Sequence, residues 1–347
     1  MKSTQVTIKD LARHLGISVA TVSRALRDLP DIHPDTKKSV IDLAREWDYQ
    51  PNQVALSLVK SRTKTIGIIV PNVGYHFFST AISGIEEEAL TAGYSVLVTQ
   101  SRESYLRELT NIQDLSRGQV DGFIISVSRE TSDYEHFRKL QKKGFPLVFF
   151  DRDVEELEVS KVVINNRLAA KTAVQHLIQQ NCKRIAILAG PAYLSLTHQR
   201  VLGYKDALIE AGLLPIDERF VVHGDYSHDN AVEMTHYLMN LPNPPDGIFA
   251  VSDRLAIGAM IALKKRKVRI PKDVAIIGFN NEPIASLLTP TLSSVVQPIK
   301  EIGRTAARLL LNQLNNKGSE SAAAEVVVLD TQLIIRESSD RSIGGRF

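Results

Sequence analysis

The first 50 residues carry three short apolar stripes with the i, i+3, i+4 spacing of helices, at positions 8–15, 22–26 and 40–47. Thr7 precedes the first stripe with Asp10 three residues after it, and Ser18 precedes the second stripe. Both hydroxyls are therefore placed to cap helix N-termini. Gly16 ends the first helix, and Pro34 opens the third. The pattern predicts a helix-turn-helix followed by a third helix.

From residue 65 onward the pattern changes to short apolar runs separated by longer amphipathic segments, which is typical of buried parallel strands with crossover helices. One series of runs lies at 66–70, 95–98, 123–125 and 146–150. A second series lies at 162–164, 184–188, 248–251 and 274–278. Two series predict an α/β body of two lobes, each with a doubly wound parallel sheet. A ligand is then expected beyond the carboxyl ends of the strands, in a cleft between the lobes.

Charge is unevenly distributed along the 347 residues. The chain holds 42 Lys and Arg against 39 Asp and Glu, a net charge of +3. Residues 1–63 hold ten of these cations and seven of these acids, which leaves 32 of each sign in the rest of the chain. A basic head on a neutral body is typical of nucleic-acid binding, although three amphipathic helices can also form a purely structural bundle. The second predicted helix favours binding, because its polar positions suit phosphates and base edges: Thr21, Ser23, Arg24 and Arg27.

Several classes of protein lack support in the sequence. No apolar run approaches the ~18 residues that cross a bilayer, and the charged N-terminus is unlike a secretory signal, so we expect a cytoplasmic protein without a membrane partner. The single cysteine, Cys182, has no intramolecular disulfide partner, and His223 and His228 lack a third metal ligand at useful spacing. The phosphate-binding, nucleophile-elbow and zinc-protease motifs are absent from the sequence. We expect neither an enzyme nor a bound metal or cofactor.

Short motifs in the head carry a resemblance to a known family. They are VTIKDLA at 6–12, LGIS at 15–18, TVSRAL at 21–26, YQPN at 49–52 and ALSL at 55–58. These stretches resemble the lac-repressor (LacI/GalR) family of bacterial transcription regulators, and the resemblance extends to about residue 338.

The resemblance implies a division of the chain. Residues 1–51 form the helix-turn-helix headpiece, 52–63 a hinge helix, 64–338 the effector-binding and dimerisation domain, and 339–347 a tail. The body is expected to have the periplasmic-binding-protein-like fold. Its N-lobe spans about 64–164 and 297–325, and its C-lobe about 166–290 and 328–338, with crossings near 164–166, 290–297 and 325–330.

The resemblance also implies contacts with double-stranded operator DNA. The hydroxyl groups expected to bind phosphates are those of Thr7, Ser18, Thr21 and Ser23. Val19 and Ala20 open the recognition helix where family members read bases, but their side chains offer only apolar contact, for example with a thymine methyl. Direct readout therefore relies on Arg24.

Residues 52–60 are too short to form a stable helix alone, since isolated helices below ~12–15 residues are marginal in water. The resemblance implies that this hinge orders on DNA through Asn52, Ala55 and Leu58, with Leu58 wedged into the minor groove. The alternative is that Leu58 is a linker residue packed on the body. Leu56 stands where the family often has arginine, which removes a polar minor-groove contact.

Polar and aromatic side chains follow the predicted strands and define a candidate effector site. With the positions implied by the resemblance, the set is Phe77, Phe78, Asp151, Arg152, Asn165, Arg200, Tyr226, Asp253, Asn280 and Gln297. Aromatic faces combined with carboxylates, amides and guanidinium groups suit a sugar-like ligand. Each residue taken singly also fits a solvated loop or a helix cap.

Departures from the family pattern narrow the range of expected effectors. Asn280 stands where an acid is common, and Leu194 and Leu196 replace polar residues that would bind a purine. A purine corepressor is therefore not expected. With Arg152 and Arg200 available, an acidic or phosphorylated sugar would meet little repulsion.

The combined prediction is a repressor that binds a palindromic operator as a homodimer and is gated by a small effector between the lobes. An activator or a corepressor-dependent regulator would have the same sequence features. A sugar-binding protein without DNA function is the remaining alternative, and the headpiece argues against it. Helix 299–314 is amphipathic and suits either the core or the dimer contact. The tail has no leucine heptads, so a dimer is expected rather than a tetramer.

Overall fold

The computed structural model describes residues 6–49, 62–152, 154–316 and 323–343. The chain forms two compact units, Met1–Lys64 and Thr65–Phe347, and each is treated by itself below. The predicted hinge contacts of Asn52, Ala55 and Leu58 lie outside the described residues.

The head consists of α1 (Ile8–Leu15), α2 (Val19–Leu26) and α3 (Pro34–Glu46). Their predicted apolar stripes meet in one small core whose fully or nearly fully buried members are Leu11, Ala12, Val22, Ala25, Val40 and Leu43. The Ser18 Oγ accepts a hydrogen bond of 3.0 Å from the Thr21 N–H, which caps α2. Gly16 ends α1 in the left-handed region with φ of 63°, so the chain turns sharply into α2. The helix-turn-helix prediction is confirmed.

The first lobe is built on a six-stranded parallel sheet with the strand order β11-β5-β4-β3-β1-β2. Its strands are β1 (Thr65–Val70), β2 (Ser95–Gln100), β3 (Gly122–Ile125), β4 (Leu147–Phe150), β5 (Ser160–Ile164) and β11 (Val326–Leu329). Its helices are α5 (His76–Thr91), α6 (Tyr105–Leu115), α7 (Glu135–Lys142) and α12 (Ile299–Asn315). The strands β3 and β4 are buried over their full lengths and β1 is buried from Ile66 onward, as their continuous apolar runs predict.

The second lobe repeats this plan with the strand order β12-β10-β9-β8-β6-β7, in which only β12 is antiparallel to its neighbour. Its strands are β6 (Ile185–Ala189), β7 (Val221–His223), β8 (Gly247–Ala250), β9 (Ala275–Phe279), β10 (Ser293–Val296) and β12 (Gln332–Ile334). Its helices are α8 (Asn166–Gln179), α9 (Ser195–Glu210), α10 (His228–Met239) and α11 (Asp253–Lys265). The predicted class, a helical head followed by two doubly wound lobes, is confirmed.

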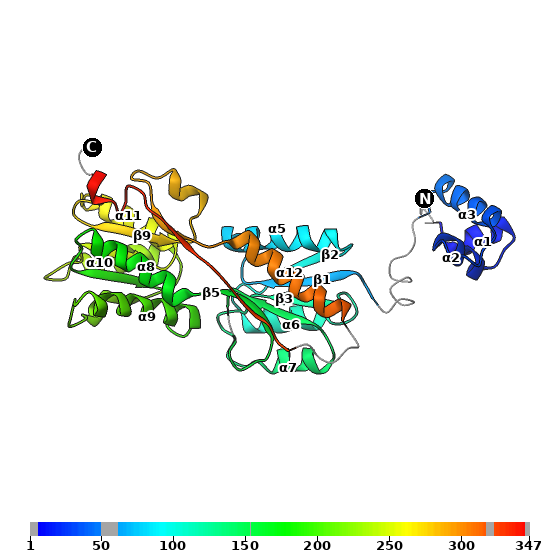
Figure 1. The fold of residues 1–347 in the computed structure, drawn as a ribbon, viewed down its shortest axis with the longest axis horizontal. Coiled ribbons are helices and arrows are strands. Elements are labelled where there is room, and N and C mark those ends of the chain that lie inside the picture. The colour runs from blue at the N-terminus through cyan, green and yellow to red at the C-terminus, as the bar shows by residue number, and fades with distance from the viewer. Residues whose placement is uncertain (1–5, 50–61, 153, 317–322, 344–347) are drawn as a thin grey trace. The chain divides into compact units, whose positions relative to one another are not determined.

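Two strand assignments differ from the sequence prediction. The apolar runs alone group 162–164 with the second sheet, but β5 pairs with β4 and β11 and so belongs to the first, where the N-lobe bounds implied by the resemblance place it. Residues 328–329 were expected in the second lobe, yet β11 also lies in the first sheet. Apolar runs reveal that a strand is buried, but they do not tell which of two similar sheets it joins. The chain passes between the lobes after β5, between β10 and α12, and between β11 and β12 (Figure 1).

Two helices of the first lobe, α5 and α12, pack unusually closely. Helices α5 and α12 lie side by side against its sheet (Figure 1). A Cβ atom at Gly303 would lie 2.0 Å from the Ala81 carbonyl oxygen, so only glycine permits this approach. Ile302, Ala306 and Leu310 on α12 are fully buried within the single chain. This stripe therefore serves the core.

Candidate functional site: an interlobe cavity and the exposed face of the head

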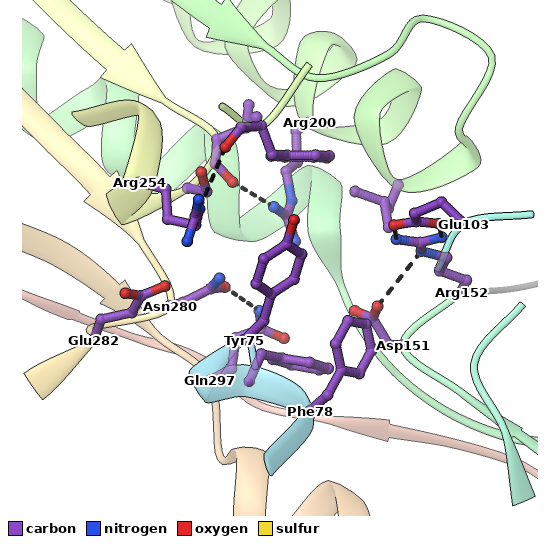
Figure 2. A pocket seen from close by; sticks show the side chains of 15 residues that line it. Tyr75, Phe78, Glu103, Asp151, Arg152, Arg200, Arg254, Asn280, Glu282 and Gln297 are labelled. Carbon is purple, nitrogen blue, oxygen red and sulfur yellow. Dashed lines mark hydrogen bonds and ion pairs between the residues drawn. The ribbon is translucent and has the colours of Figure 1, made fainter. Parts of the chain in front are cut away.

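A cavity of about 610 Å³, including the part open to solvent, lies between the two lobes (Figure 2). The first lobe contributes Tyr75, Phe77, Phe78, Glu103, Asp151 and Arg152. The second lobe and the crossing after β10 contribute Leu196, Arg200, Tyr226, Val251, Ser252, Arg254, Asn280, Glu282 and Gln297. Eight of the ten predicted effector residues line it, namely Phe77, Phe78, Asp151, Arg152, Arg200, Tyr226, Asn280 and Gln297.

Parallel sheet topology gathers these side chains. The loop after β1 carries Tyr75, the loop after β4 carries Asp151, the first turn of α11 after β8 carries Arg254, and the loop after β9 carries Asn280. The carboxyl ends of parallel strands lie at one edge of a sheet, and the corresponding edges of both sheets face the cavity.

A buried ion pair forms one wall of the first lobe. The Arg152 guanidinium donates from Nη1 to Glu103 Oε2 at 2.7 Å and from Nη2 to Glu103 Oε1 at 2.8 Å. Nη1 also donates to the Val127 carbonyl oxygen at 2.8 Å. Burial opposes the ionisation of Glu103, but the hydrogen bonds and charge of Arg152 outweigh it and hold the pKa below its ordinary value. This bidentate geometry fixes both side chains within one lobe.

A second acid anchors the loop behind that wall. Glu108 is fully buried, and its Oε2 accepts a hydrogen bond of 2.6 Å from the Ser128 N–H. Its Oε1 accepts from the Thr131 hydroxyl at 2.8 Å and lies 3.0 Å from His136 Nε2. Glu108 thereby holds the loop that follows β3, including the Val127 carbonyl that binds Arg152.

Opposite charges face each other across the cavity at Asp151 and Arg200. Asp151 has φ of 65°, an uncommon conformation for a non-glycine residue that often marks functional sites. Burial raises the pKa of its carboxyl, and the charges of Arg152 and Arg200 partly offset this. Arg200 is 4% exposed and donates to the Asn166 Oδ1 at 2.8 Å and the Val251 carbonyl at 2.7 Å. Its guanidinium lies 3.7 Å from the centre of the Phe279 ring, so cation–π contact also restrains it.

The second lobe adds neutral polar groups and an aromatic ring. The Gln297 Nε2 donates to the Asn280 Oδ1 at 2.7 Å, and both side chains line the cavity. Tyr226 lies so close to Gly190 that a Cβ atom there would approach the tyrosine hydroxyl to 2.4 Å. Amide, carboxylate, guanidinium and aromatic groups thus converge on one partly open cavity, and this combination suits the binding of a polar ring.

Two of the predicted effector residues do not line the cavity. Asp253 is fully buried, where it accepts hydrogen bonds from the Ser294 hydroxyl at 2.7 Å and the Glu282 N–H at 2.6 Å. Burial raises the pKa of Asp253 to about 7. The Asn165 Oδ1 caps α8 by accepting from the Leu168 N–H at 2.9 Å. Both residues were predicted to line the cavity because each follows a strand. Their side chains instead accept hydrogen bonds from nearby backbone N–H groups.

Several lining residues escaped the predicted set. Glu103 follows β2, Arg254 follows β8 and Glu282 follows β9, so the strand-end rule would have found them if it had been extended by a few residues. Tyr75 follows β1, where the same rule applies. These residues are charged or aromatic and lie in segments that follow the strands, where the cleft is predicted.

In the head, the predicted base-reading residues occupy exposed positions on α2. Val19 is 40% exposed, Ala20 is also exposed, and the Arg24 Nη1 lies 3.0 Å from the Asp31 Oδ2. Thr21 is half-buried, and Ser23 uses its carbonyl oxygen to accept from the Arg27 Nε at 3.1 Å. The Thr7 hydroxyl donates to the Asp10 Oδ2 at 2.7 Å. The pairings of Thr7 and Arg24 are thus local to the head.

Within the described part of the chain, no helix has the length and apolarity required to cross a bilayer.

Comparisons with known proteins cover both units. Residues 7–52 match the family "Bacterial regulatory proteins, lacI family", and residues 174–339 match a "Periplasmic binding protein-like domain". Catabolite control protein A of Priestia megaterium is 34% identical over 335 residues, which are 96% of this chain and 99% of that protein. The HTH-type transcriptional repressor CytR of Escherichia coli K12 is 35% identical over 340 residues, 97% of each chain.

Solved structures agree with this assignment. A complex of the transcriptional regulator CelR with cellobiose has a TM-score of 0.73 at 29% identity, covering 96% of this chain and 99% of its own. The lac repressor dimer bound to operator has a TM-score of 0.84, covering 97% and 99%, and at 23% identity this likeness concerns the fold. These relatives are transcription regulators. The chain belongs to the LacI family of DNA-binding bacterial transcription regulators.

Proposed function

We propose that this protein is a transcription repressor that binds a palindromic operator as a homodimer and is gated by a small sugar-like effector in the interlobe cavity. The observation that carries the proposal is the presence, in one chain, of a helix-turn-helix head and of a polar, aromatic-lined cavity between two lobes. Relatives over nearly the whole length include CytR and a ribose operon repressor of Halalkalibacterium halodurans, which is 33% identical over 96% of this chain.

The cavity supports a ring-shaped ligand rich in hydroxyl groups. Phe77 and Phe78 lie edge to face with ring centres 5.2 Å apart, and the Asp151, Arg200 and Asn280 side chains supply acceptors and donors. A pocket of this kind combines apolar contact with oriented hydrogen bonds. Relatives solved with ligands include the CelR–cellobiose complex and a LacI-family regulator of Enterococcus faecium with bound ribose.

The charge balance of the cavity revises the expected effector. Three guanidinium groups line it, but three carboxylates do so as well, those of Glu103, Asp151 and Glu282. Arg152 is already engaged by Glu103, so it offers less attraction to an anion than its sequence position indicated. We therefore propose a neutral sugar before a sugar acid or a sugar phosphate.

Exposed apolar surface supports the dimer. A groove on the second lobe is lined mainly by apolar side chains from α11, from the segment between α11 and β9 and from the segment before β10, namely Ile257, Met260, Ile261, Val268, Ile270, Leu287, Leu288 and Pro290. Leu287 is 80% exposed in the single chain, which is costly for a leucine in water. Self-association through a two-fold axis would cover the groove on both partners, and a dimer presents two heads to two operator half-sites.

Gating follows from the geometry of the cavity. An effector that contacts both walls binds one arrangement of the lobes better than another and shifts the population toward it. The lobe arrangement sets the spacing of the two hinges in the dimer, and therefore whether the hinge and Leu58 engage the operator. Useful coupling requires a differential affinity of about 1–3 kcal/mol.

The test combines operator selection with ligand screening. Binding sites are selected from a pool of random double-stranded DNA with the full-length protein. Neutral sugars, sugar acids and sugar phosphates are screened by thermal shift. We expect an inverted-repeat operator and stabilisation by at least one neutral sugar. Selection without any enriched repeat would refute the DNA role, and stabilisation by acids or phosphates alone would refute the neutral-sugar assignment.

Replacing Leu58 with Ala is expected to weaken specific operator binding and to leave the thermal shift intact, whereas unchanged operator affinity would remove the wedge from the proposal.

A further inference from the structure

A contact between the lobes closes one side of the cavity. Tyr75 precedes α5 in the first lobe, and Arg254 is the second residue of α11 in the second lobe. The Arg254 Cζ lies 4.9 Å from the centre of the Tyr75 ring (Figure 2). The Arg254 Nε also donates to the Tyr226 carbonyl oxygen at 3.3 Å. We call this pair the Tyr75–Arg254 bridge.

We propose that the Tyr75–Arg254 bridge is a latch that stabilises this arrangement of the lobes and controls passage into the effector cavity. The existence of the latch is independent of the function proposed above. Its consequence for operator binding rests on that function.

The bridge lies where the cavity continues toward solvent. A neighbouring groove shares Tyr75, Glu103, Tyr226 and Arg254 with the cavity. Both members of the bridge are half-buried and line both the cavity and the groove, so they lie at the boundary between the two. A ligand that moves from the groove to the cavity therefore passes these two side chains.

The two partners differ in how firmly their own lobes hold them. The Tyr75 ring is stacked on Phe78 with centres 6.5 Å apart and planes inclined by 26°. The hydrogen bond from the Arg254 Nε to the Tyr226 carbonyl oxygen, at 3.3 Å, is longer than a typical N–H···O contact. A fixed aromatic platform and a long flexible cation suit a contact that opens and reforms.

A second pair of opposite charges faces across the same groove. Arg129 comes from the first lobe and Asp225 from the second, and both line the groove. Hydrogen bonds from Ser227 are the main reason that the pKa of Asp225 lies below its ordinary value, and the charge of Arg129 lowers it further. Attraction between Arg129 and Asp225 across the groove therefore favours the same lobe arrangement as the Tyr75–Arg254 bridge.

The test measures lobe separation in the ligand-free, full-length protein. Spin labels are placed on engineered cysteines at Lys142 in α7 and Glu233 in α10, two exposed positions on different lobes. Native Cys182 is buried, and burial raises the pKa of its thiol to about 12, so it does not compete for the label. Labelled chains are diluted with unlabelled protein so that distances within one chain dominate. Pulsed dipolar spectroscopy then gives the distance distribution.

Four single variants, and the double variant Tyr75→Leu/Arg254→Met, separate the latch from general effects. Arg254→Met and Tyr75→Leu each remove the cation–π contact, while Tyr75→Phe keeps the ring. Arg266→Met is the matched control, because it makes the same substitution at the other end of α11, away from the cavity lining. Thermal unfolding checks that each variant is folded.

The latch predicts that Arg254→Met and Tyr75→Leu each lower the ratio of the present lobe arrangement to wider ones by about 2- to 30-fold, the range of a cation–π contact. The double variant should add little to either single change, and Tyr75→Phe and Arg266→Met should match the wild type. Unchanged distributions in both bridge variants would overturn the proposal, because other contacts would then hold the lobes. If the distances shift but operator affinity does not, the latch stands and the proposed gating of DNA binding fails.

Discussion

The two lobes share one architecture but use their charged residues differently. The first lobe pairs Glu103 with Arg152 inside its own wall, through two hydrogen bonds that do not depend on the other lobe. The second lobe points Arg200 toward Asp151 and Arg254 toward Tyr75, both of which belong to the first lobe. Charges paired within a lobe fix the shape of the cavity wall. Charges that contact the other lobe depend on how the two lobes are arranged.

The pair inside the first lobe gives the largest expected effect. Replacing Arg152 with Met leaves the largely buried Glu103 without its partner, and removal of one member of a buried pair typically costs about 3–5 kcal/mol. Urea unfolding should therefore show a large loss of stability in Arg152→Met. The double variant Glu103→Leu/Arg152→Met should recover part of that loss, and a double variant less stable than the single one would contradict this reading.

An acid in the first lobe and an acid in the second are expected to change the stability of the protein in opposite directions as pH rises. The pKa of Glu103 is lowered in the folded protein, so its contribution is present above the unfolded pKa and is lost as pH falls through the folded pKa. The pKa of Asp253 is raised from 3.8 to about 7, so its contribution is present below the unfolded pKa and is lost as pH rises through 7.

Replacing Asp253 with Asn should remove the second of these effects. Between pH 4 and pH 7 the wild type should lose stability relative to Asp253→Asn, by at most about 4 kcal/mol at roughly 1.4 kcal/mol per pKa unit. Thermal unfolding across this range measures the difference. Parallel curves for the two proteins would show that Asp253 does not titrate there.

Close helix packing is the feature that the lobes share, so matched substitutions should act alike. A Cβ atom at Gly303 would lie 2.0 Å from the Ala81 carbonyl oxygen in the first lobe, and one at Gly203 would lie 2.0 Å from the Arg167 carbonyl oxygen in the second. Gly303→Ala and Gly203→Ala should each cost about 1–3 kcal/mol of overpacking. Denaturation of the two variants tests this equivalence, and a neutral result in either would show that its helix pair relaxes freely.

The head provides the smallest effect, because its charges are exposed. Arg24 is paired with Asp31, and both side chains are about half-exposed at 53% and 50%. Such a pair contributes at most about 1 kcal/mol, so Asp31→Asn should leave stability unchanged and free Arg24 to raise operator affinity a few-fold. Arg24→Ala should instead relax sequence preference at one position in each half-site. Anisotropy titrations with operator variants distinguish this from a uniform loss, which would mark a phosphate contact.

The sequence predicted most of the fold because its signals were local. Capping residues such as Ser18, helical apolar stripes and continuous strand runs identified the head and the two-lobe body. Apolar runs alone did not assign β5 and β11 to the correct sheet, because that assignment depends on pairing between distant segments. The short, partly exposed β7 also escaped, since an exposed edge strand carries little apolar signal.

The candidate site was predictable in position but not in electrostatics. Strand ends and the family resemblance together located eight of the lining residues, while Asp253 and Asn165 satisfy nearby backbone N–H groups instead. The sequence showed Arg152 as an available cation, because nothing in it reveals that Glu103, 49 residues away, folds back to pair with it. Charge balance in a cavity is a property of tertiary contacts, and it is what turns the proposal from an anionic to a neutral sugar.

The central claim is that a ligand between the lobes changes DNA binding. The most direct measurement is the affinity of the full-length protein for its selected operator, with and without a saturating amount of the neutral sugar that stabilises it most. Fluorescence anisotropy should show a change of about 5- to 150-fold, the range of ordinary allosteric coupling, while a sugar that gives no thermal shift should have no effect. Equal operator affinity at saturation with the stabilising sugar would contradict the account.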